Sequence, residues 1–227
     1  MKGTFIDLTH TIDPSIPTWN GSCGFSSEIK MDYAKGCRVM KYSMHAGIGT
    51  HIDAPCHFFP NTLAAADLSL ENLLVPACVL DISHKVHGDM LISLEDLQNF
   101  ENEFGQIQKG SLFLAYTGWE KFWNDKDKYR NCDEFGKMHY PGFSKEAAFF
   151  LLERKVVGIG IDTLSPDGTN QGFPVHEVIL GADKYILENL ANLEKMPPIG
   201  AFAFIFPLKI AEGAEAPIRA VGFIPEK

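Results

Sequence analysis

Short apolar runs rich in β-branched and aromatic residues, set apart by turn residues, recur along the chain and predict strands. No internal repeat of about 20–50 residues accompanies them. The runs that we expect to form strands are residues 4–8, 37–43, 78–82, 111–116, 156–161, 202–206 and 220–224. The pattern therefore predicts a β-rich core.

Helical periodicity is rarer and concentrates in two segments. Residues 91–100 are expected to form a helix that Ser93 opens, because acidic residues follow it where the helix dipole favours them. Residues 144–155 show the clearest pattern, with Ser144 placed to cap the helix and apolar residues along one face. This helix leads directly into the strand expected at 156–161. Helix followed by strand in one chain indicates the α/β class.

Composition narrows the class of protein and of partner. The chain has 227 residues, 45% hydrophobic and 22% charged, without a linker-like stretch, so we expect residues 1–227 to form a single domain. The formal net charge of −9, with no stripe of Lys or Arg, argues against nucleic acid and favours a small-molecule partner. No stretch approaches the roughly 18 apolar residues of a membrane span, and the first residues lack a signal-peptide core. We therefore expect a cytoplasmic protein with no membrane partner.

The cysteines indicate reduced thiols. Their number is odd and no C-x-x-C pair occurs, which argues against a disulfide framework and a zinc knuckle. Cys56 stands beside His57 and could be a nucleophile, but strand parity points the two side chains apart, so we favour a buried thiol. The cysteines are Cys23, Cys37, Cys56, Cys78 and Cys132.

Three of the eight histidines fall within residues 45–57. In an extended segment, His51 and Asp53 share a face and lie roughly 6.5–7 Å apart, a separation from which both can reach one ion. His57 has the same parity, although Pro55 redirects the chain in between. Imidazole with carboxylate suits zinc, manganese or ferrous iron. The alternative is a polar turn in which His51 is hydrogen-bonded to Asp53.

A second polar cluster follows about 110 residues later. Asp162 ends a predicted strand and leads into a polar loop, a usual position for active-site residues. His176 and Glu188 come next. Because Glu188 stands in an apolar run, it lies either on a solvated helix face or buried against a cation.

Residues 49–58, Gly-Thr-His-Ile-Asp-Ala-Pro-Cys-His-Phe, resemble the signature of the cyclase-like amidohydrolase family, which includes bacterial kynurenine formamidases and isatin hydrolases. The spacing of twelve from His176 to Glu188 matches the second ligand pair of that family. The resemblance covers nearly the whole chain and extends to residues 7–10, 17–21, 117–119, 162–167 and 216–220.

The resemblance implies a compact α/β domain with a mixed, barrel-like β core flanked by helices, of the swivelling β/β/α type, that forms a homodimer or a higher homo-oligomer. It implies hydrolysis of an amide or lactam through a bound divalent metal, zinc or manganese. His51 and Asp53 match metal ligands, with Asp53 bridging where two ions are present, and His176 and Glu188 match the ligands of the second ion. His57 matches the catalytic histidine that shuttles a proton. Trp19 matches an aromatic residue that packs against substrate, and we expect Phe58 and Phe59 to help shape an apolar pocket.

One position departs from the family pattern His-x-Gly-Thr-His-x-Asp. The first His of that pattern corresponds to Gly47, which cannot bind a metal. His45 could substitute only if the backbone bends at one of the neighbouring glycines. We therefore expect one ion per chain, held by Asp53, His176 and Glu188, with His51 either a ligand or a residue that steers the water, and His57 either the shuttle or a further ligand. Two ions are the alternative.

Two functions follow from these residues. The first is a metal-dependent hydrolase that cleaves a C–N bond of a small, aromatic amide or cyclic amide by metal-activated water, with formylkynurenine as one candidate substrate. The second is a non-catalytic relative that binds a small ligand and whose metal site is impaired. Only Gly47 supports the second, whereas four retained metal-type residues favour the hydrolase.

Overall fold

A mixed β-barrel of seven strands forms the centre of the computed structural model, which describes residues 2–22 and 24–226. The strands follow one another around the barrel in the order β12-β11-β5-β7-β9-β10-β4, and β4 pairs with β12 to close it. The barrel strands are β4 (His51–Asp53), β5 (Leu74–Asp81), β7 (Leu112–Tyr116), β9 (Gly158–Ile161), β10 (Tyr185–Glu188), β11 (Ala201–Pro207) and β12 (Glu215–Pro225). The expected α/β class with a barrel-like core is confirmed.

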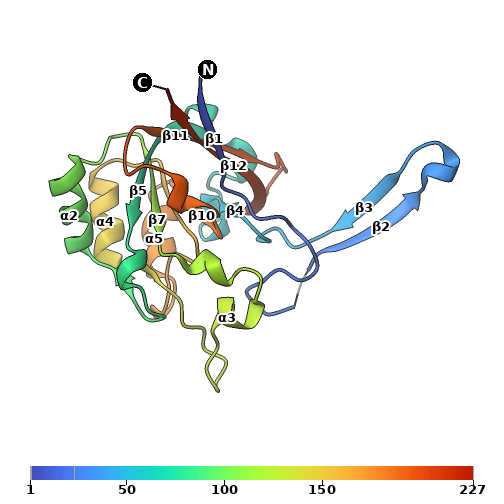
Figure 1. The fold of residues 1–227 in the computed structure, drawn as a ribbon, viewed down its shortest axis with the longest axis horizontal. Helices are drawn as coiled ribbons and strands as arrows, with labels where there is room; N and C mark the ends of the chain where they lie inside the picture. Colours follow the sequence, from blue (N-terminus) through green and yellow to red (C-terminus); the bar gives the residue numbers. More distant parts are fainter. Residues whose placement is uncertain (1, 23, 227) are drawn as a thin grey trace.

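Four neighbouring strands of the barrel, β5, β7, β9 and β10, run parallel to one another. Their connections carry α2 (Leu94–Phe104), α4 (Lys145–Glu153) and α5 (Pro174–Leu180), which lie side by side on the outer face of these strands (Figure 1). One apolar core fills the barrel and a second lies between the barrel and the helices. This is the arrangement expected where parallel strands are joined by helices.

Outside the barrel, β1 (Gly3–Asp7), β2 (Ser26–Met31) and β3 (Val39–Ser43) pair in antiparallel fashion, whereas β6 (Leu91–Ile92) and β8 (Gly142–Phe143) pair in parallel. β1 extends the sheet beyond β12. β2 and β3 form a separate hairpin that projects away from the barrel (Figure 1). The shorter helices are α1 (Leu70–Leu73) and α3 (Lys126–Arg130).

All seven predicted strands form, with ends that differ by several residues. The helix expected at 91–100 begins later than predicted, because residues 91 and 92 pair as β6 with β8. Ser93 is nevertheless its cap, with its hydroxyl accepting a hydrogen bond from the Asp96 amide at 3.2 Å. Ser144 likewise caps α4 by accepting from the Ala147 amide. The strands β2, β4 and β10 and the helix α5 were not predicted.

The described cysteines are all free thiols, in agreement with the sequence, whereas Cys23 lies outside the described residues. Cys56 is half-buried, and burial raises the pKa of its thiol, which disfavours the thiolate that a nucleophile requires. Among the helices of the described residues, none combines the length and the apolar character needed to cross a membrane.

Candidate metal centre

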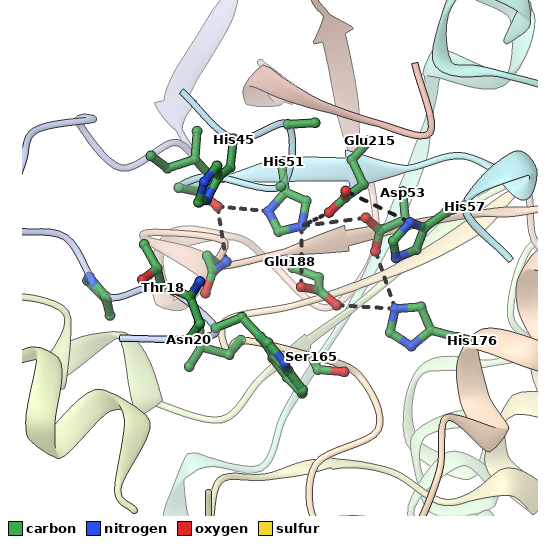
Figure 2. Close-up of a pocket in the computed structure, with 18 of the residues that line it drawn as sticks. Thr18, Asn20, His45, His51, Asp53, His57, Ser165, His176, Glu188 and Glu215 are labelled. Carbon is green, nitrogen blue, oxygen red and sulfur yellow. Dashed lines mark hydrogen bonds and ion pairs between the residues drawn. The ribbon is translucent and has the colours of Figure 1, made fainter. Parts of the chain in front are cut away.

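The short strand β4 lies between β10 and β12 and collects side chains from both. Glu188 of β10 lies directly opposite His51, and Glu215 of β12 lies directly opposite Asp53. Directly opposite residues of antiparallel strands place their side chains on the same face of the sheet. The four side chains therefore converge at one point, although up to 164 positions separate them in the sequence (Figure 2).

His176 of α5 completes this cluster from the other side (Figure 2). Its Nε2 lies 3.4 Å from Asp53 Oδ2 and 3.4 Å from Glu188 Oε1. The Nε2 of His51 lies 3.5 Å from Asp53 Oδ1 and 3.3 Å from Glu188 Oε2. Each of these two carboxylates thus faces both imidazoles, and all four residues are buried.

Hydrogen bonds outside the cluster orient both imidazole rings. His51 donates from Nδ1 to the carbonyl oxygen of Gly49 at 2.9 Å, and His176 donates from Nδ1 to Asp167 Oδ2. Asp167 is itself buried and accepts from the Val175 amide at 2.7 Å. A histidine whose Nδ1 donates in this way presents the lone pair of Nε2, the usual arrangement of a metal ligand.

The carboxylates of the cluster favour positive charge on the groups around them. Burial lowers the pKa of His51, but Asp53 and Glu188 outweigh it and raise that pKa to about 10. Burial acts likewise on His176, whose hydrogen bonds to Asp167 and the other carboxylates raise its pKa to about 12. At Glu215 burial and the charge of Asp53 raise the pKa. Without a metal, the imidazoles must hold protons to balance the carboxylates.

The donor atoms fit a divalent metal. Two groups each place three ligand atoms within 4.8 Å of one another: His51, Asp53 and Glu215 in the first, and Asp53, His176 and Glu188 in the second. Asp53 belongs to both groups. Its Oδ1 is buried and makes no hydrogen bond to any described residue, and its one charged contact is His51 Nε2 of the same group at 3.5 Å. Nitrogen and oxygen ligands of this kind suit zinc, manganese and ferrous iron.

A cavity of about 500 Å³ opens above the cluster. Three aromatic rings form its apolar wall: Phe173 lies 6.0 Å from Trp19 and 5.6 Å from Phe58 between ring centroids. Phe58 also stacks on His176 at 4.9 Å, which joins the apolar wall to the candidate ligands. Trp19 keeps 49% of its surface exposed, so the wall has apolar area to offer a ligand.

His57 lines this cavity and lies beside Asp53 and Glu215 (Figure 2). Its side chain is 30% exposed, and its Nδ1 lies 3.8 Å from Glu215 Oε2. The ring is thus close to the cluster and reaches the space that a ligand would fill. That position suits a group that moves protons.

The structure brings together every predicted site residue. His51, Asp53, His176 and Glu188 form the cluster, and the other three predicted residues, Trp19, Phe58 and His57, line the cavity. Of the two interpretations of Glu188, the solvated helix face is wrong, because the residue is buried in β10.

His45 does not replace the missing ligand, and two other expectations are not met. His45 lines the cavity but belongs to neither ligand group. Phe59 does not line the cavity and packs instead with the apolar core beneath α5. Asp162 is fully buried away from the cavity, where it accepts hydrogen bonds from Thr117 and from the Trp119 amide at 2.9 Å.

Sequence reasoning missed Glu215 and Phe173. Glu215 directly precedes the motif at 216–220, so the loss of a ligand at Gly47 could have prompted a search among the acids next to each motif. Phe173 sits in a Gly-rich loop just before α5, and its position gave no signal.

Comparison with known proteins identifies relatives along nearly the whole chain. The family described as "Putative cyclase" matches residues 6–168. Isatin hydrolase of Roseibium aggregatum is 34% identical over 194 residues, which make up 78% of this chain and 72% of that protein. Kynurenine formamidase of Geobacillus thermodenitrificans is 27% identical over 97% of both chains. Isatin hydrolase A from Labrenzia aggregata, solved with bound benzyl benzoate, superimposes with a TM-score of 0.91 at 32% identity and covers 98% of this chain and 94% of that one.

Proposed function

The chain belongs to the cyclase family of hydrolases, and we propose that it hydrolyses the C–N bond of an amide or cyclic amide in a small aromatic compound. Two relatives support this bond type by their names, since isatin is a cyclic amide fused to a benzene ring and kynurenine formamidase removes a formyl group from an aromatic amine. The observation that carries the proposal is the convergence of His51, Asp53, His176, Glu188 and Glu215 beneath an aromatic-walled cavity.

The chain's own residues would hold the metal and the substrate. Zinc or manganese would bind to the cluster of histidines and carboxylates at the floor of the cavity. Such an ion lowers the pKa of a water molecule and polarises the substrate carbonyl. Trp19, Phe58 and Phe173 would hold the aromatic part of the substrate and exclude bulk water from one side of the reacting group.

His57 would move the proton. In hydrolysis, water adds to the carbonyl carbon, the C–N bond breaks, and the leaving nitrogen takes up a proton. Half-exposed beside Glu215 and lining the cavity, His57 is placed to accept the proton from water and to deliver it to that nitrogen. The Glu215 carboxylate would stabilise the protonated ring during the transfer.

The proposal is tested by hydrolysis assays on isatin and on N-formylkynurenine, before and after removal of metal with a chelator. We expect turnover of at least one of them, its loss on chelation and its recovery with zinc or manganese. His57→Asn should lower kcat by about 10²–10⁴-fold while metal content stays unchanged, and His84→Asn at an exposed position is the matched control. Binding of these amides without turnover in the metal-loaded protein would favour the non-catalytic alternative.

We also propose that two copies associate through the β2–β3 hairpin. An isolated two-stranded ribbon is marginal in water, and this one exposes Ile29, Val39 and Tyr42. Tyr42→Asp should convert the dimer to a monomer in light scattering. Phe206→Ser, which removes an exposed aromatic side chain from β11, should leave the dimer intact. A monomeric wild-type protein would refute this association.

A further inference from the structure

We propose that Glu215 is the ligand that compensates for Gly47, so that each chain binds two divalent ions that share Asp53. This inference rests on the proposed metal-dependent function and adds to it the number of ions and the residue that completes the first group. It replaces the expectation of a single ion, which assumed that the first group lacked a third ligand. Space, strand register and charge around Glu215 support it.

The space next to Gly47 is occupied by Glu215. A Cβ atom added to Gly47 would lie 1.9 Å from Glu215 Oε1 and 2.9 Å from its Cδ, so a side chain at position 47 would displace the carboxylate from its present place. The same Cβ would lie 3.3 Å from His51 Nε2. A side chain at position 47 would thus enter the first ligand group, and the Glu215 carboxylate lies in that place.

Gly47 leaves room for this carboxylate and is not required by its backbone conformation. Gly49, two residues later, has a φ of 61°, in the left-handed region that favours glycine. Gly47 is absent from the described residues with positive φ, so its backbone would accept another amino acid. The glycine and the glutamate therefore act as a pair: the small residue leaves room for the carboxylate that arrives from β12.

Strand pairing holds Glu215 in register with the shared ligand. Glu215 lies opposite Asp53, and its Oε1 lies 4.0 Å from His51 Nε2. The alternative ligand, His45, belongs to neither ligand group, and its ring lies against Gly24, where an added Cβ would come within 2.5 Å of it. Among the described residues, Glu215 is thus the side chain that completes the first group.

The charge of the cluster agrees with two ions. Asp53, Glu188 and Glu215 carry three negative charges when ionised, and neutral histidines add none. One divalent ion leaves one negative charge in a largely buried site and two ions leave one positive charge, so the carboxylates can accommodate the second ion. A second ion would also give Asp53 Oδ1, which makes no hydrogen bond to any described residue, a cation to bind.

The test is metal content, measured by elemental analysis on full-length protein that was stripped with chelator, reloaded with manganese or zinc and dialysed. We expect about two equivalents in the wild type and about one in Glu215→Gln. The double variant Gly47→His with Glu215→Gly should hold about two, because the third ligand of the first group is then a histidine at position 47 in place of the carboxylate at position 215. Glu212→Gln, an exposed neighbour, is the matched control and should keep two.

The outcomes separate this inference from the proposed function. Two equivalents in both the wild type and Glu215→Gln would overturn the inference alone and leave Glu215 as a positioning residue for His57. One equivalent in the wild type would overturn it as well. No metal in the wild type would contradict the metal-dependent function itself. Far-ultraviolet circular dichroism and the metal-induced shift in melting temperature show whether each variant is folded and still responds to the ion.

Discussion

The two ligand groups of the cluster share Asp53 but differ in how their other ligands are held. In the second group, called the inner group below, Glu188 is buried in β10 and His176 is fixed by Asp167, a buried carboxylate with hydrogen bonds of its own. In the first group, called the outer group below, the Glu215 side chain is 27% exposed and meets its nearest imidazoles only at 3.8–4.0 Å. The inner group is preorganised and the outer one is adjustable.

Because of this difference, the two groups should differ in metal affinity and in their part in the reaction. Ligands that are oriented before the ion arrives bind it more tightly, because less ordering accompanies binding. The inner group should therefore fill first. The outer group lies beside His57 at the cavity, where a ligand that can shift accommodates the changing charge of a reaction. The shared Asp53 connects the two.

The largest effect should come from Asp53→Asn, which weakens both groups at once. The variant keeps the shape of the side chain but loses the charge that both groups require. We expect loss of both equivalents and a fall in kcat/KM of about 10³-fold or more, since the ions contribute several kcal/mol to transition-state stabilisation. Elemental analysis and steady-state assays measure the two effects. Retention of one tightly bound ion would show that the groups are independent and would break the comparison.

Asp167→Asn should affect the inner group alone. The amide can donate to His176 Nδ1 and so favours the ring tautomer that turns an N–H toward the ion. Loss of such an outer partner weakens metal affinity by about 10–100-fold. Competition with a chromophoric chelator should show one weakened ion and one that is unchanged. Equal weakening of both would mean that the difference in support between the two groups has no energetic consequence.

Local sequence patterns predicted the parts of this site that lie within one segment. The pair His51 and Asp53 follows from strand parity, and Ser93 and Ser144 were recognised as helix caps because capping is a contact between near neighbours. The resemblance to a family added His176 and Glu188. In each case the information lies within a few residues or in a known motif.

The contact that involves Glu215 could not be predicted in this way. It depends on the closure of the barrel, in which the three-residue β4 pairs with β10 on one side and β12 on the other. A strand this short has no periodicity to detect, and pairing between strands more than 130 residues apart is set by the packing of the whole core. The departure at Gly47 was visible in the sequence, but its compensation required the three-dimensional structure.

The aromatic wall of the cavity should affect substrate binding, in contrast to the two ligand groups, which affect metal binding. Trp19→Ala should raise KM about 5–10-fold for an aromatic amide and change kcat little, because the ring offers apolar area without touching the ligand cluster. The metal content should stay at the wild-type value. Steady-state kinetics on an aromatic and an aliphatic amide check this, and an equal rise in KM for both would contradict the role assigned to the ring.

The smallest effect concerns Glu120, a half-buried carboxylate outside the site. Burial, followed by a hydrogen bond with Glu194, raises the pKa of Glu120 to about 8, against an ordinary value of 4.5. The folded protein therefore keeps a proton that the unfolded chain releases, so stability should fall as the pH rises from about 4.5 to about 8.

Glu120→Gln replaces the protonated acid by a neutral amide that can still accept from the Asn192 amide. The variant should be more stable than the wild type by about 1 kcal/mol at pH 8, a value reduced for partial exposure, and should differ little at pH 5. Urea unfolding at both pH values measures this, with the exposed Glu103→Gln as control. A stability difference that does not depend on pH would mean that Glu120 does not hold this proton in the folded protein.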